Sequence, residues 1–342
     1  MAAPRKRASP RTGKGQEGPA DHRAPAAGEP DRALRALRQA PDRKEDQGIG
    51  PETKILYDNA KQDASVQQQQ VDTMITKKVD ALIIDAVDAK SIASSVKKAD
   101  GKGIPVVAYD RLAEGPVKAY TSVDNERVGK IQGESLLKEL GDDAAKGEIV
   151  MMNGSVTDPN AKMYKDGAHS VLDGKVKVGK EYDTKEWKPE NANENMKGAI
   201  SSLGKDKIVG VYSANDGMAA ASSPPSRAPA TSSPVTGQDA ELSAVQRILA
   251  DEQFMSVYKP YKPEADAAAE MAVALAQGKK LDGISRSTVD SGSEKKIPAI
   301  IVTPFALTKA DIAQYVGKEG FFNRDEICTA KYTSQCEKAG LK

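Results

Sequence analysis

The sequence is poor in aromatic residues and in net charge, and each shortage argues against a class of function. Aromatic residues make up 4% of the 342 residues, too few for the stacking platform that binds single-stranded nucleic acid. Lys and Arg number 50 against 49 Asp and Glu, so no overall charge draws the chain to nucleic acid or to a membrane surface. We therefore expect no nucleic-acid partner.

Further absences concern membranes and catalysis. No apolar run reaches the roughly 18 residues of a membrane-spanning helix, and the basic N-terminus lacks the apolar core of a secretion signal. The two histidines are too few to favour acid–base catalysis by histidine, and His169 lies in a helical pattern that indicates a structural role. No G-x-G-x-x-G, Walker A or G-x-S-x-G motif is present. We predict no enzymatic activity, no cofactor and no metal site.

Two cysteines, Cys328 and Cys336, lie close together near the C-terminus. Their spacing is neither that of a zinc ribbon nor that of a redox pair. A disulfide that staples the C-terminal segment is the favoured interpretation, and it would imply an oxidising compartment. The alternative is two unpaired thiols in a surface tail.

From Ile55 onward, short apolar strands alternate with helical patterns, over a length sufficient for two domains. "ALIID", "PVVAYD" and "EIVMMNG" are unbroken apolar strands, and "NERVGKIQGESLLKEL" is typical of the helices between them. Strands without polar alternation are buried on both faces, so this order predicts parallel sheets with helices on each side. A late strand is expected over "AIIVTPFALT".

Polar side chains stand where the predicted strands end. The set consists of Asp110 with Arg111, Asp124 with Asn125, Asn153, Asn215 with Asp216, and Gln238 with Asp239. In open α/β sheets, ligands bind outside the carboxyl ends of the strands, so the set as a whole predicts a binding cleft. Each single position is equally explained as a helix cap or a loop turn, because these use the same Asp and Asn side chains.

Two stretches break the alternation of strands and helices. Residues 1–53 are rich in Ala, Pro and Arg and are interpreted as an aberrant disordered tail. The Pro/Ser run at residues 221–233 stands where a helix should follow "SANDGMAA", and its prolines exclude a helix.

A change of reading frame accounts for both stretches. Read two bases later, the codons of the Pro/Ser run permit "IITALKGAGYIVP", an amphipathic helix that leads into a strand. Residues 21–47, read one base later, permit a strand, a polar loop and a helix. We hypothesise that both stretches are frame errors in the gene or its sequencing. The alternative is a natural basic tail and a natural Pro-rich linker.

Seven motifs in the same order resemble the xylose-binding and related aldose-binding proteins of bacterial ABC importers. They are "VVAYDRL", "SVDNERVG", "NGSVTDPNAK", "WKPENA", "SANDG", "GQDAELSAVQRI" and "VYKP". The resemblance runs from about residue 54 to 342, with a gap at 221–233. It implies the type I periplasmic binding protein fold, in which two doubly wound α/β domains joined by three hinge crossovers close on a sugar. The first strand, which lies inside the sheet, and the first helix would be missing from this chain.

The resemblance also implies a domain division and a set of sugar ligands. One lobe would comprise residues 54–112 and 259–285, the second 113–258 and 286–320, and a tail at 321–342 would carry the cysteine pair. The ligands carried over by motif are Asp110, Arg111, Asn160, Trp187, Glu190, Asn215 or Asp216, Asp239 and Lys259. Glu190 is the weakest of them, because it also suits the first turn of a helix. The family's first loop adds a basic ligand, and that loop is absent as the chain is read.

Such residues suit a sugar, because each hydroxyl both donates and accepts hydrogen bonds that acids, amides and a guanidinium complement. The resemblance implies a monomeric, extracytoplasmic protein, periplasmic or anchored as a lipoprotein. Its partners would be a monosaccharide, xylose or a similar aldose, and a membrane permease that recognises the closed form. The alternative is a sugar-responsive transcription regulator with the same effector-binding fold. It requires an N-terminal helix-turn-helix, and residues 1–50 lack that periodicity.

Overall fold

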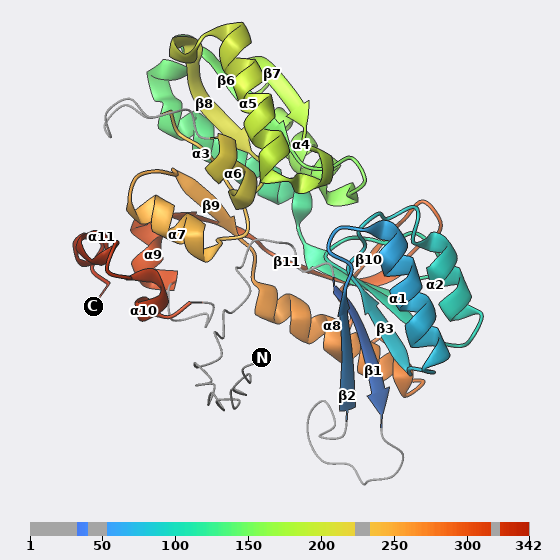
Figure 1. Ribbon diagram of the computed structural model, residues 1–342. Coiled ribbons are helices and arrows are strands. Elements are labelled where there is room, and N and C mark those ends of the chain that lie inside the picture. Colours follow the sequence, from blue (N-terminus) through green and yellow to red (C-terminus); the bar gives the residue numbers. More distant parts are fainter. Residues whose placement is uncertain (1–32, 40–52, 223–232, 316–321, 342) are drawn as a thin grey trace, which may run out of the picture.

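Two α/β lobes joined by three crossovers make up the protein (Figure 1). This is a computed structural model in which residues 33–39, 53–222, 233–315 and 322–341 are described. Among the described residues, no helix is both long and apolar enough to cross a bilayer. The sequence-predicted fold class, two doubly wound lobes linked by three crossovers, is confirmed.

The first lobe is built on a seven-stranded sheet in the order β10-β11-β5-β4-β3-β1-β2. Its central strands pair in parallel, whereas β1, β2 and β10 run antiparallel to their neighbours. The strands are β1 (Ala33–Gln39), β2 (Thr53–Asn59), β3 (Ala81–Ile84), β4 (Val106–Tyr109), β5 (Ala119–Val123), β10 (Ser287–Val289) and β11 (Ile297–Val302).

Helices cover both faces of this sheet because its central strands are apolar on both sides. One face packs against α1 (Ala64–Thr76) and α2 (Ala93–Asp100), which contribute Val71, Met74 and Val96 to a buried cluster. The other face packs against α8 (Tyr261–Ala276), whose Met271 lies in a cluster with strand residues such as Val107.

The second lobe holds a parallel three-stranded sheet in the order β7-β6-β8 and an antiparallel pair, β12-β9. Single parallel bridges, Val211 with Val235 and Gln238 with Val257, connect the two through the extended segment 235–238. The strands are β6 (Glu148–Asn153), β7 (Lys177–Asp183), β8 (Ile208–Ser213), β9 (Met255–Tyr258) and β12 (Phe305–Thr308).

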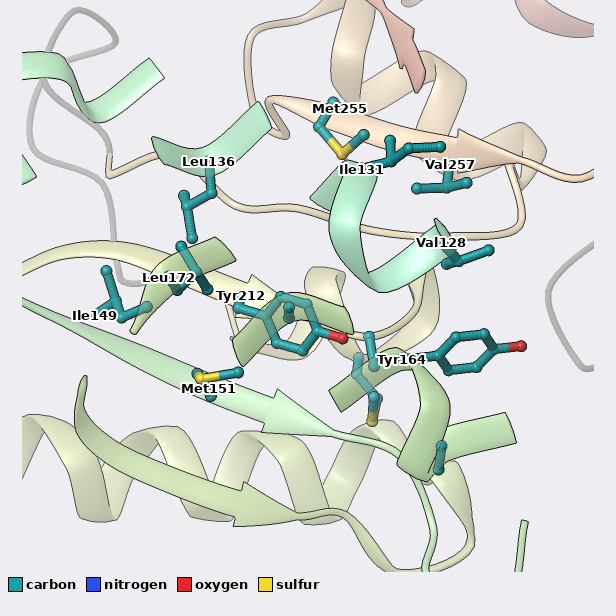
Figure 2. Close-up of a cluster of buried hydrophobic side chains, with 14 of the residues drawn as sticks. Val128, Ile131, Leu136, Ile149, Met151, Tyr164, Leu172, Tyr212, Met255 and Val257 are labelled. Carbon is teal, nitrogen blue, oxygen red and sulfur yellow. The ribbon is translucent and has the colours of Figure 1, made fainter. Parts of the chain in front are cut away.

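The largest core of the second lobe lies between its sheet and two helices packed on each other, α3 (Asn125–Leu140) and α4 (Pro159–Leu172). Figure 2 shows Tyr212 of β8 among side chains from these helices and from β6 and β9. The remaining helices are α5 (Pro189–Leu203), α6 (Asp216–Ser222), α7 (Leu242–Leu249), α9 (Lys309–Tyr315), α10 (Arg324–Ile327) and α11 (Thr333–Lys338). Short 3₁₀ turns span Gly141–Ala145, Lys185–Trp187 and Lys205–Lys207. A disulfide joins Cys328, at the end of α10, to Cys336 within α11.

The strand pairings correct two of the expected lobe boundaries. β5 pairs with β4, and β11 pairs with β5, so both strands belong to the first lobe and not to the second. The crossovers therefore lie between β5 and α3, between β9 and α8, and between β11 and β12. The expected strand at 299–308 divides at Thr303 and Pro304, because proline lacks the N–H that would continue the ladder.

Residues 33–39, expected to lie in a disordered tail, instead form β1. This strand lies between β2 and β3 and runs antiparallel to both, at the sheet position where the resemblance implies the missing first strand. A strand there gives hydrogen-bond partners to backbone groups of β2 and β3 that would otherwise face each other unpaired. Thr53, the last residue of the expected tail, begins β2, whereas residues 1–32 and 40–52 of that tail and residues 223–232 of the Pro/Ser run lie outside the described residues.

Candidate functional site

A cavity lies between the lobes, at the carboxyl ends of their parallel strands. Its internal volume is about 10 Å³, so the lining side chains themselves fill nearly all of the space between the lobes. Its lining is polar except for one indole ring and consists of Asp110, Arg111, Asp158, Trp187, Asn215, Gln238, Asp239 and Lys259. These side chains come from six separate segments of the chain, so the fold brings together positions far apart in sequence.

Asp110 follows β4 directly and adopts a left-handed backbone with φ 55°. A non-glycine residue rarely takes this conformation, so its surroundings must hold it. The hydroxyls of Ser122 and Tyr120 both donate to the Asp110 carbonyl oxygen, at 2.7 and 2.8 Å. Two neighbours on β5 thus fix the turn that aims the Asp110 carboxylate and the next side chain, Arg111, into the cleft.

The start of α4 faces Asp110 from the second lobe. Asp158 caps this helix by accepting a hydrogen bond from the Asn160 N–H, and Pro159 occupies the first turn. Asn160 then reaches across the cleft, where its Nδ2 donates to Asp110 Oδ1 at 2.7 Å and to the Asp110 carbonyl at 3.1 Å. This amide therefore joins the two lobes directly.

Asp158 has a second role, as the partner of two cleft side chains. Its Oδ2 lies 2.7 Å from Arg111 Nε and accepts a hydrogen bond from Trp187 Nε1 at 3.1 Å. Burial alone lowers the pKa of Arg111, but Asp158, Asp85 and Asp110 outweigh it and raise the pKa above its ordinary value. The guanidinium is held as a permanent cation, with its planar fork fixed in the cleft.

Trp187 combines packing with exposure to the cavity. Its ring meets Tyr164 edge-on, with centroids 6.2 Å apart, and belongs to the main core of the second lobe. A β-carbon at Gly154 would lie 2.1 Å from the Trp187 ring atoms Cη2 and Cζ2, so only glycine permits the indole to lie there. The ring is rigidly placed with part of its surface lining the cavity.

Lys259 lies on the second crossover, between β9 and α8. Its Nζ is 2.8 Å from Asp239 Oδ1 of the second lobe and 3.6 Å from Asp110 Oδ2 of the first. Burial alone lowers the pKa of Lys259, but Asp110 and Asp239 outweigh it and raise the pKa well above its ordinary value. One hinge cation thus neutralises two carboxylates that face each other from opposite lobes.

Most of the sequence-predicted site residues converge. Asp110, Arg111, Trp187, Asn215, Asp239 and Lys259 line the cavity, and Asn160 contacts it through Asp110. Of the pair offered as alternatives, Asn215 lines the cavity, whereas Asp216 is fully buried behind it and points toward Gln253 and Ser256. Glu190 is exposed in the first turn of α5, outside the cavity, where a glutamate favours the start of a helix.

Sequence reasoning left two lining residues out of the ligand set, Asp158 and Gln238. Asp158 stands two residues before Asn160 in the motif "DPN", where an acid that caps the following helix needs no ligand to explain it. Gln238 ends the segment that leads to Asp239, and it was noted only as a strand-end amide. Within the described part of the chain, no three His, Cys, Asp or Glu side chains are grouped to hold a metal ion.

Residues 43–280 match the family described as periplasmic binding protein domain. The D-xylose-binding periplasmic protein of Haemophilus influenzae is 34% identical, over 80% of this chain and 82% of its own length. The multiple sugar-binding periplasmic receptor ChvE of Rhizobium radiobacter is 32% identical, over 83% of this chain and 86% of its own.

Among solved structures, an ABC transporter solute binding protein from Clostridium phytofermentans with bound β-D-glucose matches with a TM-score of 0.68 and 26% identity. The match covers 78% of this chain and 87% of that one. The structural match supports the overall fold. The chain belongs to the periplasmic binding protein family.

Proposed function

We propose that the protein binds one monosaccharide, xylose or a similar aldose, in the cleft between its lobes and delivers it to the permease of an ABC importer. The observation that carries this proposal is the convergence of acids, amides and two cations from both lobes around one indole ring. The relatives named above are described as sugar-binding, which supports the same ligand class. No specific observation favours a transcription regulator.

The lining groups match the chemistry of a polyol. The Asp110 and Asp239 carboxylates accept hydrogen bonds from hydroxyls, while Arg111 and Lys259 donate to hydroxyl oxygens. Charge-assisted hydrogen bonds of this kind contribute roughly 1.5–3 kcal/mol each where water is excluded. A sugar that lacks one hydroxyl would leave a buried partner unsatisfied, so the same groups discriminate among aldoses.

A sugar would replace contacts that these groups make with one another. Asp110 is held by Asn160 and Lys259, and Arg111 by Asp158, so the polar groups are already oriented before a ligand arrives. Because these contacts join opposite lobes, a sugar that bonds both sides favours the closed arrangement by its higher affinity for that state. We propose that the closed form is what the permease recognises and that no bond of the sugar is broken.

The protein acts outside the cytoplasm in this proposal. The curated relatives named above are periplasmic proteins. The disulfide between Cys328 and Cys336 agrees with that location, since disulfides persist in oxidising compartments.

Calorimetric titration of the chain with D-xylose, D-glucose, D-galactose and L-arabinose tests the proposal. We expect one site per chain for at least one sugar, with a change in the emission of Trp187, the sole tryptophan. Asp110→Asn should weaken binding about tenfold or more, because it removes a charged acceptor. Lys98→Ala, which breaks an exposed ion pair with Asp72 away from the cleft, serves as the control. A folded chain that releases no heat with any of the four sugars would contradict the proposal.

A further inference from the structure

A buried polar cluster lies behind the cleft in the second lobe, and its central carboxylate does not line the cavity. We call it the Asp216 cluster. It consists of Asp216, Glu241, Arg247, Gln253 and Ser256. Asp216 begins α6 and is 0% exposed. A buried carboxylate without a ligand needs a structural or positioning purpose, because burying it is unfavourable.

The Asp216 carboxylate accepts three hydrogen bonds from segments around Asp239. Oδ1 accepts from Gln253 Nε2 at 2.7 Å, and Oδ2 accepts from the Glu241 N–H at 3.0 Å and the Ser256 hydroxyl at 2.7 Å. The same Ser256 oxygen accepts a hydrogen bond from the Ala240 N–H at 2.9 Å. The Asp216 N–H itself donates to the Gln238 carbonyl at 3.0 Å.

These bonds act on a turn with unusual backbone angles. Asp239 has φ 99° and Ala240 has φ 49°, and non-glycine residues adopt such angles only when their surroundings impose them. The groups just before and after Asp239, the Gln238 carbonyl and the N–H groups of Ala240 and Glu241, are held by Asp216 directly or through Ser256.

We propose that Asp216 is a positioning residue: it does not touch the sugar, and it holds the turn Gln238–Glu241 so that the Asp239 carboxylate reaches the cleft. This inference rests on the proposed function, in which Asp239 is a sugar ligand. Held in this way, Asp239 Oδ1 meets Lys259 Nζ at 2.8 Å and the Tyr261 hydroxyl at 2.9 Å.

Two neighbours support this arrangement. A β-carbon at Gly237 would lie 1.9 Å from Asp216 Oδ1 and 2.4 Å from Gln253 Nε2, so the glycine leaves room for their hydrogen bond. Arg247 donates from Nε and from one terminal nitrogen to Gln253 Oε1, at 3.0 and 2.9 Å. Because the Gln253 oxygen is held by Arg247, its amide nitrogen faces Asp216, and the carboxylate is fixed from both sides.

A double-mutant cycle separates positioning from general stabilisation. Ser256→Ala removes the hydroxyl that links Asp216 to the Ala240 N–H, and Asp216→Asn removes the carboxylate. Each change is made in the natural background and in Asp239→Asn. The measurements are calorimetric affinity for D-xylose, or for whichever panel sugar binds, and unfolding in urea. Ser233→Ala, which removes a hydroxyl bonded to the Ile208 carbonyl in the same lobe, is the matched control.

We expect Ser256→Ala to weaken sugar binding about tenfold in the natural background and less than about twofold in Asp239→Asn. Ser233→Ala should leave affinity unchanged in both. An equal loss of affinity in both backgrounds, or none in the natural background, would overturn the inference. If Asp216→Asn does not fold, Ser256→Ala still decides the question, since it leaves the carboxylate in place.

The unfolding measurements keep this inference distinct from the proposed function. If the natural chain binds no sugar, the proposed function fails. The positioning of Asp239 is then judged from the unfolding equilibrium constants. In the double variant Ser256→Ala/Asp239→Asn, that constant should differ by about threefold or more from the value expected if the two separate effects simply multiplied. Strict additivity would show that the Asp216 cluster does not act on Asp239.

Discussion

Arg111 of the first lobe and Asp158 of the second form an ion pair across the cleft, 2.7 Å from Nε to Oδ2, with both side chains 3% exposed. Trp187 donates to the same carboxylate oxygen. The pair is buried only while the lobes are together, so its hydration is coupled to opening of the cleft. The ion pair therefore influences both ligand affinity and the balance between open and closed forms.

Asp158→Asn should shift the protein toward an open form. It leaves the buried Arg111 with the longer contact to Asp85, at 3.8 Å. Loss of one partner of a buried ion pair destabilises by about 3–5 kcal/mol, and opening of the cleft relieves this by hydrating the guanidinium. Small-angle X-ray scattering without sugar should show a larger radius of gyration. Lys118→Ala, which breaks an exposed pair with Asp100 within the first lobe, should leave it unchanged. An unaltered radius in Asp158→Asn would contradict this coupling.

Gly154→Ala should displace Trp187. The added methyl would lie 2.1 Å from the indole ring, and a rigid aromatic ring packed against Tyr164 has little room to yield. We expect a shift in tryptophan emission and at least a tenfold loss of sugar affinity, checked by fluorescence titration. Gly174→Ala, at a position with no atom within 4 Å, controls for the effect of replacing a glycine, although its positive φ adds some local strain. Normal affinity in Gly154→Ala would show that the ring position is not needed for binding.

The charges around His169 predict a pH-dependent contribution to stability. Its Nδ1 lies 2.8 Å from Asp173 Oδ1 and its Nε2 3.2 Å from Glu181 Oε1. Burial alone lowers the pKa of His169, but Asp173 and Glu181 outweigh it and raise the pKa above 6.5. A raised pKa in the folded state means that the stabilisation is fully present below about pH 6.5 and is lost above the folded pKa.

Urea unfolding of His169→Gln at several pH values measures this contribution. We expect the variant to lose about 0.5–1 kcal/mol of stability at pH 5.5 and much less at pH 9, the magnitude typical of partly exposed pairs. Glu181, a hydrogen-bond partner of His169, titrates instead at acidic pH. Burial alone raises its pKa, but Lys165, His169 and Asn153 outweigh it and lower the pKa to about 2. Its contribution is therefore present above about pH 4.5 and lost as the pH falls toward 2. If His169→Gln lost the same amount of stability at pH 5.5 and at pH 9, the raised pKa of His169 would be contradicted.

A chain with both hypothesised frame errors corrected should be more stable. On β2, Ile55 is 63% and Tyr57 51% exposed, although their neighbour Leu56 packs against the core. A restored strand and helix would cover this apolar surface, and burial of an apolar side chain stabilises by about 1.5–3 kcal/mol. Denaturant unfolding should show a gain of at least about 2 kcal/mol. The nucleotide sequence of the gene should be determined first. Codons that do not permit the restored translations would contradict the hypothesis of frame errors.

A local rule predicted part of the cleft, whereas Asn160, Trp187 and Lys259 were assigned only through the family resemblance. Asp110 and Arg111 follow the apolar strand β4, Asp239 follows the extended segment 235–238, and the carboxyl ends of parallel strands meet at one edge of a sheet. Asp216 shows the limit of that rule. An acid at the end of a strand faces the cleft or the core according to where it lies around the axis of the helix that follows. The residue type alone does not specify that position.

The lobe boundaries were harder to predict because a strand pattern does not say which sheet the strand joins. "AIIVTPFALT" has one apolar run, yet β11 pairs with β5 of the first lobe and β12 pairs with β9 of the second. Pairing is decided by long-range contacts such as Phe305 stacking on Tyr258, with ring centroids 4.8 Å apart. Asp158 escaped prediction for a related reason, since its capping of α4 conceals its contact with Arg111 on the other lobe.

A crystal structure of the protein grown with D-xylose tests the central claim most directly. The account predicts one sugar between the lobes, bonded to Asp110 and Arg111 on one side and to Asn160, Asn215 or Asp239 on the other, with Trp187 against its ring. A sugar bound elsewhere on a closed protein, or contacts confined to a single lobe, would contradict the claim that the two lobes close on a monosaccharide.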